Sequence, residues 1–405
     1  TRGGKYSSPS AEFGFMNNQD RIDHNSHGYQ QLTFVADYKL ELDSEYWLDF
    51  RLSYDMLDSE METGNAIVNK REDEYYSRVM GHWTPNESHH LALGVEYSHE
   101  QFGKPSPGYP NTKPHIQGQP HNKFQPVIDG KPQLAFPEWH SDTLSILGEH
   151  QWNINDEFTT FLGLRVDQTD YTSEMWSGRA ALVYTPTLKD SIKLIFNHSV
   201  RRIDEAELRN FEQNGVDTGN TEKLNNYELR YERQHSEELW MGLSAFYVDY
   251  DVISWSFSAL SVSPVGNQKH FGLEFETTYE TDQFKIGLAH SYIKLIDFDS
   301  EIPDGDNVVT AKHQGYGDDL ANWYNHQTTI YGHYKFNEKW KVTSSLGILW
   351  SLPGGKDLAK HNEADDSDPF HSFFPQRDSG FDRSWEESVF LNLGLQYKPT
   401  EKLTL

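Results

Sequence analysis

The sequence predicts an all-β fold, specifically a transmembrane antiparallel β-barrel of the outer-membrane type. Three observations predict it. Segments of about 10–14 residues alternate between apolar and polar side chains, the links between them are short and long in strict turn, and an aromatic residue accompanies nearly every short link. We expect about 17 strands, from 11–16 to a short stub at Leu403, in a single domain over residues 1–405.

The alternation follows the two-residue period of a β-strand. In the segment 32–42, Leu, Phe, Ala and Tyr side chains fall on one face and Thr, Val, Asp and Lys side chains on the other. Segments 48–56, 227–232 and 391–397 repeat the pattern. The interior of a soluble barrel could not hold so many large side chains from about sixteen strands. The apolar face is therefore predicted to contact lipid.

The links divide into two classes that alternate along the chain. The short ones are rich in turn-forming residues and lie at 43–44, 85–88, 153–156, 186–189, 236–237, 282–283, 337–339 and 399–401. The long ones lie at about 58–72, 104–139, 203–223, 255–268, 298–324 and 353–384. Strict alternation places turns at one end of a barrel and loops at the other, and in bacterial barrels the turns are periplasmic.

Aromatic residues near the short links predict a girdle at the periplasmic membrane interface. They are Trp47, Trp83, Trp152, Tyr184, Trp240, Tyr279, Phe336, Trp340 and Tyr397.

Composition excludes several classes of protein. Only 36% of residues are hydrophobic, the mean hydropathy is -0.76, and no apolar run approaches the roughly 18 residues of a membrane helix. The absence of cysteine removes disulfides, cysteine-ligated metals and thiol nucleophiles. A net charge of -27 would repel nucleic-acid phosphates. We expect a monomer in the bacterial outer membrane, in contact with its lipid.

Catalysis is not predicted. A serine–histidine dyad needs both side chains on one face, and the pairs His198–Ser199 and His290–Ser291 are adjacent in strands, so their side chains point to opposite faces. No phosphate-binding glycine loop is present, and no cofactor is expected.

No metal site is predicted either. Asp365, Asp366 and Asp368 lack the glycine-turn spacing of a calcium loop, so a solvated acidic loop is the favoured interpretation. His89 and His90 lie in a short turn without the pattern of a zinc site.

Histidine and aromatic residues concentrate in three long loops. Loops held by a rigid scaffold commonly carry binding sites, so these residues are the predicted ligand contacts: Tyr109, His115, His121, His313, Tyr316, Trp323, Tyr324, His371 and Phe373. The alternative, that these loops are polar because they are solvated, stays open.

Three stretches resemble the TonB-dependent outer-membrane receptors. Residues 179–187 (RAALVYTPT), continued by 192–202, are similar to the family's R-x-x-L-x-Y-x-P strand and the strand that follows it. Residues 219–229 (GNTEKLNNYEL) resemble a G-N-P loop that enters a strand, and 247–253 with 272–276 resemble two further strands. Arg201, Arg202 and Ile203 replace the family's R-A-P element, and Thr221 replaces a proline, which disfavours a haem-receptor subgroup.

The resemblance implies a barrel of about 22 strands, of which this chain would be a part truncated at both ends. The plug domain, the TonB box and the closing strand would lie outside it. Seven charges would point inward, toward the plug or toward water in the lumen: Asp37, Lys39, Asp49, Arg51, Glu228, Arg230 and Glu232. The implied function is uptake of a scarce ligand, such as a ferric siderophore, with energy from the TonB complex through an absent N-terminal segment. The alternative is a passive porin-like channel whose lumen charge sets selectivity.

Overall fold

The computed structural model describes residues 6–7, 26–63, 66–104, 127–128, 131–135, 139–203, 219, 221–256, 261–302, 323–351 and 387–399. Within these ranges the regular secondary structure consists entirely of β-strands. No helix in the described residues is long and apolar enough to cross a membrane. The chain divides into two compact units: residues 1–150 with 164–176, and residues 151–163 with 177–405. The prediction of a single domain is not tested by this division.

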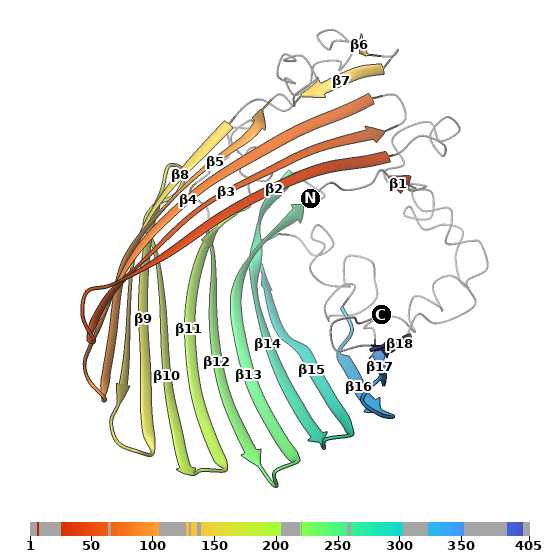
Figure 1. Ribbon diagram of the computed structural model, residues 1–405. Coiled ribbons are helices and arrows are strands. Elements are labelled where there is room, and N and C mark those ends of the chain that lie inside the picture. The colour runs from red at the N-terminus through yellow and green to blue at the C-terminus, as the bar shows by residue number, and fades with distance from the viewer. Residues whose placement is uncertain are drawn as a thin grey trace. The chain divides into compact units, whose positions relative to one another are not determined.

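The first unit is built on four long strands paired antiparallel in chain order (Figure 1, red to orange). They are β2 (Ser26–Glu41), β3 (Tyr46–Thr63), β4 (Ala66–Asn86) and β5 (His89–Lys104). Strand β5 also pairs with β8 (Trp139–Asn153), and the unit includes β9 (Phe158–Thr169) from Leu164 onward. Three short strands complete the set: β1 (Tyr6–Ser7) on β2, and β6 (Val127–Ile128) on β7 (Lys131–Ala135), which runs parallel to β4.

The second unit is a run of antiparallel strands in which each pairs with the next along the chain (Figure 1, yellow-green to blue). The strands are β10 (Met175–Thr187), β11 (Asp190–Arg202), β12 (Thr221–Gln234), β13 (Leu239–Ser256), β14 (Ser261–Glu280), β15 (Phe284–Ser300), β16 (His326–Lys335), β17 (Trp340–Trp350) and β18 (Glu387–Tyr397). This order needs no crossover connection, so every long strand follows its neighbour through a hairpin.

The fifteen long strands correspond to fifteen of those predicted. The segment 11–16 and the stub at Leu403 lie outside the described residues, so the full strand count stays a prediction. Two predicted long links are wrong. Strands β3 and β4 continue through most of 58–72, and β13 and β14 through most of 255–268. These stretches lack a regular apolar–polar alternation, as the adjacent Ile67 and Val68 illustrate, although the backbone pairing continues through them.

The large apolar side chains are the exposed ones. Phe34 is 59% exposed and Leu393 74% exposed, and other leucines on the same faces are similar. Buried apolar side chains among the described residues are scattered, as Met80, Ile203 and Val265 are. A soluble domain buries its apolar face, whereas a membrane barrel turns that face to lipid and satisfies its backbone between strands. The predicted alternation is confirmed by the register, in which Phe34 lies opposite Tyr54.

Side-chain caps explain why the short links are turns. The Oδ1 atom of Asp43 accepts hydrogen bonds from the backbone N–H groups of Glu45 and Tyr46, at 2.7 and 2.8 Å. Asn86, Asn155 and Asn337 make the same pair of bonds in their own turns. Such Asx turns reverse the chain locally. Seven of the eight predicted short links join consecutive strands as expected, and the eighth, 399–401, lies mostly outside the described residues.

Most of the predicted girdle aromatics pair on the apolar face beside these turns. Trp83 stacks on Tyr46, and Trp340 stacks on Tyr397 at 4.3 Å between ring centroids. The girdle prediction is wrong for Trp47. This residue alternates with the apolar Leu48, and its ring stacks on His82 on the polar face. The girdle prediction is also wrong for Trp240, because its ring lies under the guanidinium of Arg230, which is on the polar face. These two indoles belong to the polar face and not to the girdle.

One glycine is required by the backbone. Gly266 has a φ angle of 141°, and the register between β13 and β14 shifts beside it, between Val252 and Ile253. A Cβ atom at position 266 would lie 2.2 Å from the carbonyl oxygen of Asp299. Only glycine fits both conditions, so Gly266 fixes the irregular pairing at this point.

Candidate functional site

The polar face of the first unit carries a closed ion-pair network around Arg165 on β9. Its Nε donates to Asp167 Oδ1 at 2.7 Å, and its two terminal nitrogens donate to Glu96 Oε2 at 2.5 Å and to Ser145 Oγ at 2.8 Å. Tyr76 donates to the other Glu96 oxygen at 2.8 Å. Glu96 and Asp167 are only 8% and 7% exposed. Two buried carboxylates therefore depend on one guanidinium for compensation.

The second unit repeats this arrangement with different strands. Arg230 on β12 donates to Glu232 at 2.6 Å, to Glu276 at 2.9 Å and to Ser244 at 3.1 Å. Lys193 on β11 reaches the other oxygen of Glu232 at 2.7 Å. The network joins four strands, β11 to β14, across the polar face. Each unit thus carries, on its polar face, a network of charged side chains that compensate one another.

The remaining charges predicted to point inward are also partnered. Arg51 forms a bidentate pair with Asp37 at 2.7 and 3.2 Å, and Lys39 reaches Glu41 at 2.8 Å. Asp49 lies 3.0 Å from Nε2 of His82, and Glu228 accepts a hydrogen bond from Ser244. Whether these charges face a plug or water stays open.

The apolar face of the second unit holds a groove of about 730 Å³. Its lining includes the small residues Ala180 and Ala245 and larger side chains such as Leu182, Phe196 and Tyr247. Because the lining is almost entirely apolar, with Thr160 and Glu228 among the few polar residues, the groove offers few groups that would orient a polar chelate. It therefore does not resemble a site for such a ligand.

A family model described as "TonB dependent receptor-like, beta-barrel" matches residues 1–405. The chain belongs to this family. The resemblance predicted from the strand motifs is confirmed, and so is the fold class, because the family consists of outer-membrane β-barrel transport receptors.

Solved structures of similar fold include several receptors of this kind. The ferric enterobactin receptor of Pseudomonas aeruginosa has a TM-score of 0.65 at 14% identity, with 94% of this chain and 55% of that chain covered. The ferric-catecholate import receptor Fiu of E. coli has a TM-score of 0.64 at 12% identity, with coverage of 98% and 63%. The iron transporter FrpB of Neisseria meningitidis has a TM-score of 0.66 at 14% identity, with coverage of 94% and 58%. The receptor barrel thus spans less than two thirds of each relative. No curated protein matches it in sequence.

Two of the nine predicted ligand contacts on the receptor barrel are described. Trp323 precedes β16 and is 55% exposed, and the hydroxyl of the adjacent Tyr324 lies 3.0 Å from Ser388 Oγ on β18. The other seven lie outside the described residues: Tyr109, His115, His121, His313, Tyr316, His371 and Phe373. Asp365, Asp366 and Asp368 also lie outside them. The prediction of these contacts stays a prediction.

Several histidine contacts have no signal in the linear sequence. His90 lies 3.2 Å from His82 on the polar face, while its neighbour His89 points the other way and lies 3.0 Å from His150. His326 stacks on Trp350 with 3.8 Å between ring centroids, and its Nδ1 lies 3.3 Å from His290. Each pair joins different strands, so strand register decides which rings meet.

Proposed function

We propose that this chain is the barrel portion of an outer-membrane receptor that captures a ferric siderophore or a similar iron chelate and imports it with energy from the TonB complex. The family match over residues 1–405 carries the proposal. The names of the similar structures support the ligand class, since they bind or transport ferric enterobactin, ferric catecholates and iron.

The polar face supports a gated receptor. The networks around Arg165 and Arg230 hold charged side chains in fixed positions on several strands. Charges that hold one another in place in this way would offer a plug domain a surface with a defined hydrogen-bonding pattern. In this proposal the plug and the segment that reaches the TonB complex belong to the full-length protein.

Ligand capture is proposed at the loop end of the strands. Trp323 presents an exposed indole beside a tyrosine that is anchored to β18. An exposed aromatic face can stack on the rings of an aromatic chelate. Trp323→Ala is expected to weaken chelate binding. Phe336→Ala is the matched control, because it removes a similarly exposed ring from the β16–β17 turn at the opposite end of the strands.

The experiment measures uptake of a radiolabelled ferric catecholate by cells that carry the full-length protein as their one receptor for it. We expect uptake that requires both the protein and TonB. Conductance in planar bilayers supplies the second measurement, since a plugged receptor is nearly silent. TonB-independent uptake together with large open conductance would establish the passive porin-like channel instead.

A further inference from the structure

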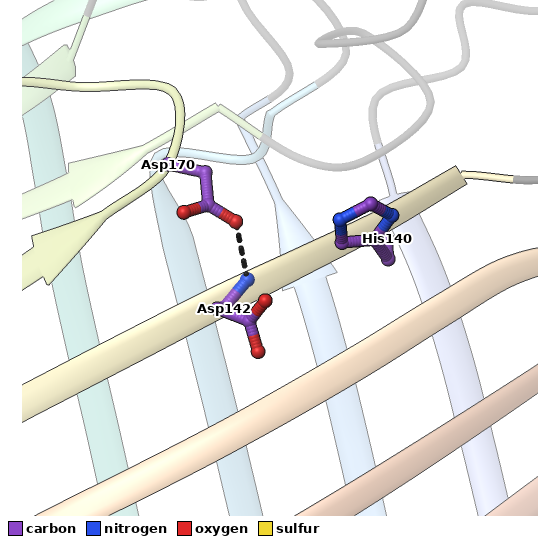
Figure 2. Close-up of side chains that lie close together, drawn as sticks. All are labelled: His140, Asp142 and Asp170. Carbon is purple, nitrogen blue, oxygen red and sulfur yellow. Dashed lines mark hydrogen bonds between the residues drawn. The ribbon is translucent and has the colours of Figure 1, made fainter.

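We propose that His140, Asp142 and Asp170 form a binding site for a divalent transition-metal ion of the Zn²⁺ class. Figure 2 shows His140 and Asp142 on β8 and Asp170 on the segment that follows β9, with the Asp170 carboxylate directed at β8. The site is separate from the ion-pair networks of the polar face, and nothing in the proposed function requires it.

The three ligands offer one atom each at suitable separations. An imidazole nitrogen of His140 and one carboxylate oxygen from each aspartate all lie within 4.8 Å of one another. Ligands bound at about 2.1 Å from one ion lie at most about 4.2 Å apart. His140 and Asp170 are exposed, so small side-chain rotations can bring their donor atoms onto a common ion.

Two hydrogen bonds already hold the ligand-bearing segments together. The backbone N–H of Asp142 donates to Asp170 Oδ2 at 3.0 Å, the bond drawn in Figure 2. The Tyr171 hydroxyl donates to the carbonyl oxygen of His140 at 2.9 Å. The turn after β9 is therefore fixed to β8 beside the site. An ion would meet a largely formed set of ligands and would not have to order a free loop.

Asp142 is oriented by a second set of residues. Its Oδ1 accepts a hydrogen bond from the Tyr97 hydroxyl at 2.5 Å and lies 2.7 Å from Nδ1 of His99. Both partners come from β5, and both use the same oxygen, so the ion would take Oδ2. Carboxylates that ligate metals are commonly held in this way by outer partners. Tyr97 and His99 act here as positioning residues.

The donor set selects the class of metal. One imidazole and two carboxylates combine a borderline nitrogen ligand with hard oxygen ligands, which suits Zn²⁺ and neighbouring first-row ions. Calcium needs six to eight oxygen ligands, roughly, and two aspartates supply few of them. Two carboxylates facing one position also concentrate negative charge, which favours a cation there.

The test titrates the purified full-length protein in detergent with Zn²⁺ by calorimetry, and with Co²⁺ by absorption, whose visible bands report nitrogen–oxygen coordination. We expect His140→Gln and Asp170→Asn each to weaken one equivalent of binding by about tenfold or more. Asn at position 170 retains an oxygen that accepts the Asp142 N–H, so this variant preserves the turn.

Two controls match these changes elsewhere. Glu149→Gln removes a carboxylate from the same strand, and His235→Gln removes an exposed imidazole from the β12–β13 turn. Both are expected to bind Zn²⁺ like the parent. Equal thermal unfolding of all four variants without metal shows that the fold is kept, and if His140→Gln fails to fold, Asp170→Asn decides. Unchanged binding in both site variants, or equal loss in the controls, overturns the proposal.

Discussion

Replacing Leu393 by arginine tests the orientation of the apolar face. Leu393 lies near the centre of β18, which runs from Glu387 to Tyr397, and its side chain is 74% exposed. Strand residues rise about 3.3 Å each, and with a tilt of roughly 40° the strand climbs about 25 Å, which is the height of the apolar band of a membrane barrel. The stacked Tyr397–Trp340 pair marks the turn-end interface. Leu393 is four residues from it, so it lies within about 3 Å of the bilayer midplane.

An arginine at that depth costs about 2–4 kcal/mol of the free energy of unfolding. If this face contacted water instead, the same substitution would change the free energy of unfolding by no more than about 0.5 kcal/mol. The assay is urea unfolding of the protein in phospholipid vesicles, followed by tryptophan fluorescence. Asn392→Arg is the matched control. Asn392 is the residue next to Leu393, and its side chain lies on the polar face, where it donates a hydrogen bond to Ser345. A loss below about 0.5 kcal/mol for Leu393→Arg, or an equal loss for the control, refutes a lipid-facing assignment.

Three further outcomes follow from the same geometry. Arg165→Leu leaves two buried carboxylates uncompensated and should cost about 3 kcal/mol of the free energy of unfolding. Arg51→Leu, whose partner is 57% exposed, should cost far less because water screens the pair; equal losses in urea unfolding would contradict the role of burial. Gly266→Ala forces a side chain into a strained backbone region and against a carbonyl, so we expect a loss of about 1–3 kcal/mol, while Gly178→Ala, whose new Cβ meets its nearest atom at 3.8 Å, should change thermal stability little. Asn337→Ala removes both capping bonds of its turn and should cost about 1–2 kcal/mol in the same melt, with an unchanged melting temperature as the result against it.

The strands are predictable from the sequence because a barrel between lipid and water requires apolar and polar residues to alternate within each strand. Each residue of 32–42 faces either lipid or the polar interior, so the two-residue period of the strand is visible in the sequence. The turns were equally accessible, since Asp43 and Asn337 cap residues only two and three positions away. Trp47 was misassigned because aromatic residues suit both faces near a turn.

Side-chain partners that are far apart in the sequence cannot be predicted from it, for a physical reason. Arg165 and Glu96 are 69 residues apart, and their meeting depends on the registers of several strands. The cluster of His140, Asp142 and Asp170 depends on the same registers, and its sequence spacing matches no metal motif. The continuation of β3 and β4 is not predictable from the alternation, because apolar residues there, such as the adjacent Ile67 and Val68, do not follow a two-residue period.

The length of β4 has a mechanical consequence. It has 21 residues, and about 10 suffice to cross the hydrocarbon layer, so on the order of 25 Å of strand stands clear of the bilayer. Paired with β3 along this height, it forms a two-stranded projection whose described tip, the Thr63–Ala66 pair, lies far from the lipid. Short peptide tags inserted at that tip should leave the transmembrane part undisturbed, and they would be reached by antibodies on intact cells.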